Sequence, residues 1–270
     1  MANLSSHQAL YHYLRDLIEQ HIVTEDDALV FDAFQRNDIR HACQAIREAH
    51  SGEVEYQHLT LRFGSQGEQS VYQFELSEPM AFCLDLYSLY LALRQSRFQM
   101  ETFHPDLISN VVVPIRADAL LWPAGALFLD QILQFHRAAF AHVVPSVQIN
   151  FAHPLHPELD ELVEQIRENA YAQWFELYTA AENFEQIARY KPDMLKLAVS
   201  LENKEDRSAF LPIVRFLRQH RFKWVAGRVA SQTELNQYKL LGASYYFGYF
   251  SDIPTSLSFK TFDDADNDSW

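Results

Sequence analysis

A few side chains in this sequence are candidates for acid–base catalysis or metal binding. His58 lies in an alternating segment and is a candidate general base, although a half-buried histidine of a strand is the simpler interpretation. Glu176 is a candidate lone acid, but no partner for it is evident and a structural or solvated role is favoured. His153 and His156, in His-Pro-Leu-His-Pro, are candidate metal ligands, but a proline-rich loop with solvated imidazoles is favoured.

The aromatic run over residues 244–250 offers a second kind of chemistry, stacking against a nucleobase. Such a run is more typical of a barrel core, in which alternate residues face opposite layers. The sequence contains no phosphate-binding glycine loop and no nucleophile elbow. An enzyme of some other chemistry is therefore disfavoured, since no acid and base present themselves as a pair.

The composition narrows the classes of partner. Among 270 residues, 22 are Lys or Arg and 36 are Asp or Glu, so the formal net charge is −14. A surface of this sign repels phosphate backbones, and direct nucleic-acid binding is not expected. The two cysteines, Cys43 and Cys83, are too few for a disulfide framework or a thiolate zinc site.

The distribution of apolar residues predicts a soluble, cytoplasmic protein. The first twenty residues lack the basic start and apolar block of a signal peptide. The most apolar stretch, over residues 119–135, is interrupted by Pro123, Gly125 and Asp130 and is too short to span a membrane. No membrane association is expected.

Hydrophobic periodicity predicts helices and strands in alternation. Helices are expected over about the first twenty residues and over residues 38–50, 79–98, 124–141, 157–169, 182–190, 204–220 and 233–241. Strands are expected over residues 28–34, 54–63, 110–115, 146–151, 173–178, 194–199, 223–229 and 244–250.

About eight strands alternating with helices, with short connections, indicate an α/β protein with a parallel sheet covered by helices. The strand count favours a (β/α)8 barrel. A doubly wound open sheet is the alternative, but no glycine-rich turn follows any strand. In a barrel the active site lies at the carboxyl ends of the strands.

Those strand ends carry one carboxylate, that of Glu176. A hydrolytic site with two divalent ions needs several oxygen ligands to hold the ions about 3.5–4 Å apart. The residues themselves therefore argue against metal-dependent phosphodiester chemistry, and we expect no metal ion and no cofactor.

The last third of the chain resembles a known family. The segments Met194-Leu195-Lys196-Leu197, Val225-Ala226-Gly227-Arg228-Val229-Ala230-Ser231 and Phe247-Gly248-Tyr249-Phe250-Ser251-Asp252-Ile253-Pro254 are similar to the end of an EAL domain. The segment His58-Leu59-Thr60-Leu61-Arg62 resembles its Glu-x-Leu-x-Arg signature. The resemblance implies an EAL-type barrel with an N-terminal helical segment, in a bacterial family that linearises cyclic di-GMP with two divalent metals.

The resemblance also implies that most functional residues of the family are replaced here. Arg62 matches the signature arginine, Lys196 matches the catalytic lysine, and Glu176 retains one acid of an Asp-Asp pair. These three are the candidate residues of a vestigial pocket. At the remaining positions this chain has a different residue from the family. His58 and Thr60 replace the glutamate and leucine of the signature, Pro114 replaces a metal-binding asparagine, Gln148 replaces the next glutamate, Ala198 replaces a later aspartate, Phe247 replaces a glutamine, and residues 227–230 lack both acids of a Glu-Gly-Val-Glu run. Gln35 is a candidate for an early glutamine that contacts the nucleotide in the family.

We therefore expect a degenerate, catalytically inactive EAL-like regulatory protein that acts through protein–protein interaction, in motility or biofilm signalling. A basic transcriptional regulator is the expected kind of partner, because the chain is acidic. The alternative is a receptor that binds cyclic di-GMP without hydrolysing it. The expected organisation is an N-terminal helical segment with the first strand at residues 1–53, integral to the barrel, the degenerate barrel at 54–257, and an acidic, partly disordered tail at 258–270.

Overall fold

The computed structural model describes residues 4–64, 67, 69–150, 155–177, 184–197 and 204–257. Eight strands of the described chain form a closed ring in the order β1, β2, β4, β5, β6, β7, β8, β9 and back to β1. The ring confirms the expected barrel and excludes the doubly wound open sheet, whose edges would be unpaired. Its strands are β1 (Ile39–Glu48), β2 (Val54–Phe63), β4 (Asn110–Arg116), β5 (Val143–Gln148), β6 (Trp174–Leu177), β7 (Met194–Leu197), β8 (Trp224–Ala226) and β9 (Tyr245–Tyr246).

The direction of β1 distinguishes this barrel from a regular (β/α)8 barrel. β1 runs antiparallel to both of its neighbours in the ring, β2 and β9, whereas every other pair in the ring is parallel. Two short strands lie outside the ring: β3 (Gln69–Ser70) pairs with β2, and β10 (Thr255–Ser256) pairs with β1.

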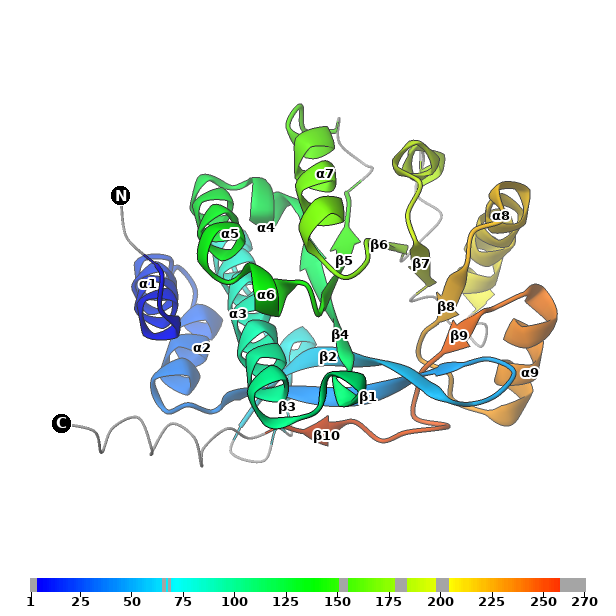
Figure 1. Cartoon of the computed structure of the whole chain (residues 1–270), viewed down its shortest axis with the longest axis horizontal. Helices are drawn as coiled ribbons and strands as arrows, with labels where there is room; N and C mark the ends of the chain where they lie inside the picture. Colours follow the sequence, from blue (N-terminus) through cyan, green and yellow to red (C-terminus); the bar gives the residue numbers. More distant parts are fainter. Residues whose placement is uncertain are drawn as a thin grey trace.

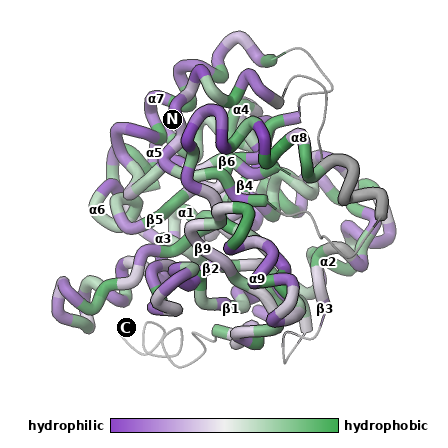
Figure 2. Tube along the Cα trace, turned by 90° about the vertical axis from the view of Figure 1, so that its right-hand side faces the viewer, coloured by the Kyte–Doolittle hydropathy of each residue, from purple (hydrophilic) through white to green (hydrophobic). Residues whose placement is uncertain are grey.

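Helices follow the parallel strands and cover the outside of the barrel (Figure 1). Along these outer helices, hydrophobic and hydrophilic residues alternate, as expected for helices with one face on the sheet (Figure 2). The α-helices are α1 (His7–Gln20), α2 (Glu25–Gln35), α3 (Glu78–Thr102), α4 (Ala117–Leu121), α5 (Pro123–Phe135), α6 (Arg137–Phe140), α7 (Leu159–Asn169), α8 (Lys204–His220) and α9 (Gln232–Leu241), and 3-10 turns are found at η1 (Val71–Gln73), η2 (Pro105–Leu107) and η3 (Phe184–Tyr190). No helix of the described residues is long and apolar enough to cross a membrane.

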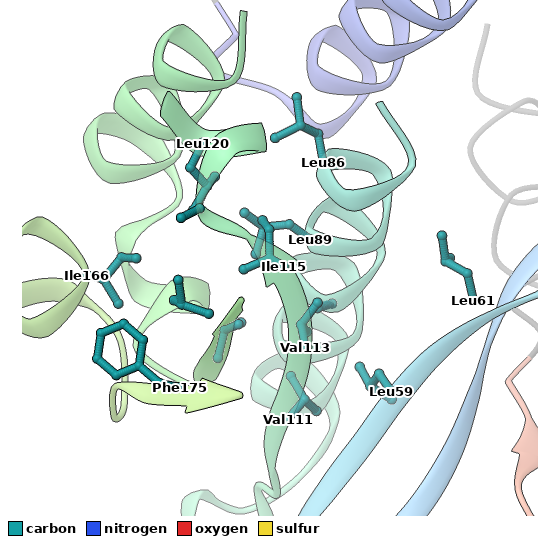
Figure 3. Close-up of a cluster of buried hydrophobic side chains, with 14 of the residues drawn as sticks. Leu59, Leu61, Leu86, Leu89, Val111, Val113, Ile115, Leu120, Ile166 and Phe175 are labelled. Atoms are coloured by element: carbon teal, nitrogen blue, oxygen red, sulfur yellow. The ribbon is translucent and has the colours of Figure 1, made fainter. Parts of the chain in front are cut away.

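Two hydrophobic layers hold the barrel together. The larger layer lies between strands and helices, where Val111, Val113 and Ile115 of β4 face α3, which carries Leu89 (Figure 3). The smaller layer fills the barrel interior with alternate residues of the same strands. Its buried members are Ile46, Val112, Val144, Trp174, Met194, Val225 and Phe247.

Two of the expected elements near the N-terminus are wrong. Residues 28–34 belong to helix α2 and not to a strand, because Thr24 and Asp27 form a capping box that starts the helix: the Thr24 hydroxyl accepts from the Asp27 N–H (3.0 Å), and the Asp27 carboxylate accepts from the Thr24 N–H (2.9 Å). Residues 38–50 hold strand β1 and not a helix. The helix-forming alanines, glutamine and arginine of this segment yield to backbone pairing with three strands, β2, β9 and β10.

The remaining differences are smaller. The helix expected over residues 124–141 is two helices, α5 and α6, which meet at His136, and the segment before Tyr190 is a 3-10 turn. The acidic tail expected at residues 258–270 lies outside the described residues.

Candidate functional site

A hydrogen bond across the barrel axis identifies the side chains that face its interior. Lys196 Nζ, on β7, donates to Nε2 of His58, on β2, at 2.9 Å. In the ring order these two strands are separated by β4, β5 and β6, so they lie on opposite sides of the barrel. Both side chains therefore point inward, toward the carboxyl ends of the parallel strands, where barrel active sites are built.

Lys196 also forms an ion pair with the adjacent strand. Its Nζ lies 2.8 Å from Glu176 Oε2, and the two side chains are 2% and 4% exposed. The register of β6 and β7 places Glu176 directly opposite Lys196. The same carboxylate oxygen accepts from the hydroxyl of Ser146 (3.4 Å) and from the Nε2 amide of Gln148 (3.3 Å), both on β5. The ammonium and the carboxylate thus satisfy each other inside the barrel.

Burial determines the protonation of the histidine in this group. Removal from water lowers the pKa of His58 well below its ordinary value, and the positive charge of Lys196 lowers it further. Burial also lowers the pKa of Lys196, against the opposing effect of the Glu176 carboxylate. A neutral His58 accepts from the lysine ammonium, so the imidazole lone pair that a general base would use is already engaged.

Phe247, the residue that follows β9, covers the group. Its ring stacks on the His58 imidazole, with centroids 4.4 Å apart and an interplanar angle of 29°, and Lys196 Nζ lies 5.8 Å from its centroid. Gly227 permits this position, because a Cβ there would lie 3.0 Å from the Phe247 ring and 2.8 Å from the Leu197 carbonyl oxygen.

The side chains at the barrel axis do not suit a pair of divalent cations. Such ions prefer several carboxylate and other oxygen ligands, whereas this group offers one carboxylate whose nearest neighbour is an ammonium. Within the described residues, no three His, Cys, Asp or Glu side chains are grouped so that they could hold a metal ion. The donor set therefore does not fit the two-metal centre that the sequence resemblance implies.

Of the three candidate residues from the sequence, the structure brings together Glu176 and Lys196 and places Arg62 apart. Arg62 lies on β2 beyond His58, where its Nη2 donates to the hydroxyl of Tyr249 at 3.3 Å in an exposed position. It lines a cavity of about 300 Å3 between β2, β4 and α3, which also receives Asp85 and Arg116.

The other candidates from the sequence have structural settings. His156 Nδ1 accepts from the Glu158 N–H at 3.2 Å, and His156 belongs to no group of potential metal ligands among the described residues. His153 and Ala198 lie outside the described residues. The aromatic run is divided: Tyr245 and Phe247 face the barrel interior, whereas Tyr249 and Phe250 are exposed, so the core interpretation is right for its first part alone.

Sequence reasoning missed several residues of the site. Ser146 was detectable, because it lies two residues before Gln148 on the same face of β5. Gln44 was hidden by the expectation of a helix over residues 38–50; it is buried on β1 and donates to the main-chain oxygen of Asp252 at 2.6 Å. Gln35, expected near the site, is instead exposed at the end of α2.

Solved structures with a similar fold include EAL-domain proteins. The chain matches the PaMucR phosphodiesterase in complex with cyclic di-GMP (TM-score 0.69, 17% identity, 88% of this chain and 100% of that chain). It also matches the S helix-GGDEF-EAL portion of Vibrio cholerae LapD bound to cyclic di-GMP (TM-score 0.67, 16% identity, 83% of this chain and 56% of that chain). A third match is Klebsiella pneumoniae BlrP1 in a complex with manganese and cyclic di-GMP (TM-score 0.62, 16% identity, 81% of this chain and 56% of that chain).

No protein-family model matches the sequence, and a search of curated proteins finds no match. The chain spans little more than half the length of the solved LapD portion and of the BlrP1 chain, and the full length of the solved PaMucR chain. The likeness is one of fold: the chain has the EAL-type barrel that the sequence resemblance predicts, while its antiparallel β1 is a feature of the structure that the sequence analysis did not predict.

Proposed function

We propose that this chain is a regulatory protein of EAL fold that does not hydrolyse cyclic di-GMP and acts by binding a protein partner. The observation that carries the proposal is that Glu176, the one carboxylate that the described residues place at the barrel axis, is already paired with the Lys196 ammonium. Two divalent cations need several oxygen ligands, and Lys196 itself matches a lysine that the family resemblance gives as catalytic, so the shortage of carboxylates and not the positive charge argues against a metal centre.

The buried setting strengthens this argument. A divalent ion would have to displace the ammonium from Glu176, and the released charge would be left in a position that is 2% exposed to water. An unpaired buried charge is strongly unfavourable. His58 would also lose its hydrogen bond from Lys196 and remain stacked beneath Phe247.

The partner proposal rests on charge and on an exposed apolar surface. The net charge is −14, and α2 begins with Glu25 and Asp26. Val23 is 73% exposed and Leu29 is 53% exposed, just before and within the same helix. α1 and α2 precede the first barrel strand and lie outside the barrel (Figure 1). Acidic and apolar side chains together suit a basic partner, such as a DNA-binding regulator.

Hydrolysis is tested with purified protein, cyclic di-GMP and either Mg2+ or Mn2+, with the PaMucR phosphodiesterase as the positive control. We expect no linear product above the background without protein. Metal-dependent hydrolysis by this chain, lost in the Glu176→Gln variant, would overturn the first half of the proposal.

The partner is tested by comparing two charged surface variants in affinity capture from the native host. We expect one basic protein to be retained by the parent chain and lost on Leu29→Lys. Leu107→Lys, a matched change at an exposed position on η2, should retain it. Equal retention by both variants would show that α2 does not hold the partner.

A second function, reception of cyclic di-GMP, has one observation in its favour. Within the described residues, the Arg62 guanidinium has one hydrogen bond, to the Tyr249 hydroxyl, and no carboxylate partner. An arginine guanidinium can donate two parallel hydrogen bonds to a phosphate. Calorimetric titration with cyclic di-GMP, with Ca2+ and then with EDTA, tests this function: micromolar binding that Arg62→Ala weakens by more than about tenfold, roughly 1.4 kcal/mol, supports it.

A further inference from the structure

The cavity beside Arg62 exists because two neighbouring strands separate. β2 and β4 are paired at Tyr56–Asn110, Gln57–Val111 and His58–Val112, and at no residue beyond these. β4 nevertheless continues to pair with β5 as far as Arg116 and Gln148. The carboxyl ends of β2 and β4 therefore diverge, as Figure 3 shows above Leu59 and Val111. Pro114 lies in the stretch of β4 that no longer pairs with β2, and it has no N–H to donate to a neighbouring strand.

Side chains of opposite character line the opening. The lining contains apolar residues, here called the apolar wall, and polar residues, here called the rim. The volume of about 300 Å3 is at the lower end of the range for small-molecule sites. The apolar wall consists of Leu59, Leu61, Val71, Leu76, Ala81 and Leu84. The polar lining includes Thr60, Arg62, Ser70, Asp85, Arg116 and Gln148.

The rim has more positive than negative charge. Arg116 Nη1 lies 3.1 Å from Asp85 Oδ1 and donates to the Ala81 carbonyl oxygen at 3.1 Å, and its backbone N–H donates to Asp85 Oδ2 at 2.9 Å. Arg62 adds a second guanidinium without a carboxylate partner among the described residues. Among the described lining residues, two guanidiniums and one carboxylate leave a surplus positive charge beside a leucine-rich wall, in a chain whose net charge is −14.

We propose that this cavity binds a small amphiphilic carboxylate, with its anionic head on Arg62 and Arg116 and its hydrocarbon body against the leucine wall. The planar guanidinium matches a carboxylate with two parallel hydrogen bonds, and burial of a short hydrocarbon chain against Leu59, Leu61 and Leu84 adds the apolar contribution. This inference uses neither the barrel axis nor α2, on which the proposed function rests, but it shares Arg62 with the second function, reception of cyclic di-GMP.

Asp85 makes the site sensitive to pH. Burial raises the pKa of the Asp85 carboxyl to about 6, against the opposing effect of Arg116. Among the described residues, two other charged groups lie near it: Glu176 on β6, whose negative charge also raises this pKa, and Arg62 on β2, which lines the same cavity. α3 itself contributes the uncharged Ala81, Leu84 and Ser88. Protonation of Asp85 releases Arg116, so the carboxylate of a ligand binds more strongly below pH 6.

The experiment is calorimetric titration of the full chain with octanoate, with 1-octanol as the uncharged ligand of equal chain length, at about pH 8 and about pH 5.8. We expect octanoate to bind at least about tenfold more tightly than octanol, and more tightly at the lower pH. Equal affinity for the two ligands would overturn the proposal, because the arginines would then play no part.

Four variants locate the binding. Arg116→Gln removes one head-group contact and Ala81→Leu fills the cavity with a good helix former, and each should weaken octanoate binding by about tenfold or more. The Asp85→Asn variant at about pH 8 should bind octanoate as tightly as the parent chain does at the lower pH. The affinity of this variant for octanoate should not change with pH. Arg15→Gln, a matched change on the surface of α1, should bind like the parent chain. Unchanged binding in Arg116→Gln and in folded Ala81→Leu would overturn the assignment to this cavity.

Discussion

Two ion pairs near the carboxyl ends of the barrel strands have similar chemistry and different surroundings. Lys196 and Glu176 are 2.8 Å apart and almost completely buried, under the ring of Phe247. Arg116 and Asp85 are 3.1 Å apart, with side chains that are 42% and 18% exposed at the rim of a cavity. The first pair fills the place where a barrel enzyme would hold its reacting groups. The second has solvent and an apolar wall beside it, so one of its members can change partner.

The difference shows that the surroundings of a charge pair decide what it can do. Inside the barrel, each charge has lost its water and depends on the other, so the pair is fixed and its removal is costly. At the rim, water already screens the guanidinium, and an exchange of carboxylates costs little. The predictions below test this contrast, from the largest expected effect to the smallest.

Lys196→Met should destabilise the protein by about 3–5 kcal/mol, because Glu176 is then left buried without its counter-charge. The free energy of unfolding from urea titration at neutral pH measures this effect. The double variant Lys196→Met/Glu176→Leu should recover at least half of the loss, since it removes both charges together. A loss of about 1 kcal/mol or less in the single variant would show that the pair is as replaceable as a surface pair.

Asp85→Asn should change how stability depends on pH. The folded-state pKa of this carboxyl is raised from 3.8 to about 6, so the folded protein binds the proton more tightly than the unfolded chain does. Its contribution to stability therefore falls as pH rises from about 4 to about 6, and asparagine removes that fall. The difference in free energy of unfolding between the variant and the parent chain should therefore shift in favour of the variant by about 1–3 kcal/mol as pH rises from about 4.5 to about 7.5.

The control for this prediction is Asp16→Asn, which removes one negative charge from the surface of α1. Urea titrations of the three proteins at several pH values provide the comparison. A difference between Asp85→Asn and the parent chain that stays constant with pH would contradict the raised pKa and, with it, the pH dependence of carboxylate binding.

Arg116→Gln should change the free energy of unfolding at neutral pH by less than about 1 kcal/mol, because its side chain is 42% exposed. Thermal and urea unfolding of this variant measure the effect, and the same sample is used for octanoate binding. A loss as large as that of Lys196→Met would erase the contrast between the two pairs.

The sequence was sufficient for features that depend on local pattern. The alternation of residues 54–63 predicts a strand, and β2 has those bounds; the helical spacing of residues 204–220 predicts α8 with its bounds. The alternation of strands and helices predicts the barrel, and the types of residue at the strand ends predict the shortage of carboxylates. The family resemblance singles out Glu176 and Lys196, whereas the residues alone show no partner for Glu176 and favour a structural or solvated role for it.

Tertiary structure decided what local pattern does not contain. Residues 38–50 have helix-forming side chains, yet they form β1, because closing the barrel requires a strand between β2 and β9 and backbone pairing there outweighs local preference. The contact of Lys196 with His58 crosses the barrel, and the ring closure alone brings β7 opposite β2. The cavity at Arg62 and Arg116 likewise depends on where two strands stop pairing, which is a property of the closed sheet and of no single segment.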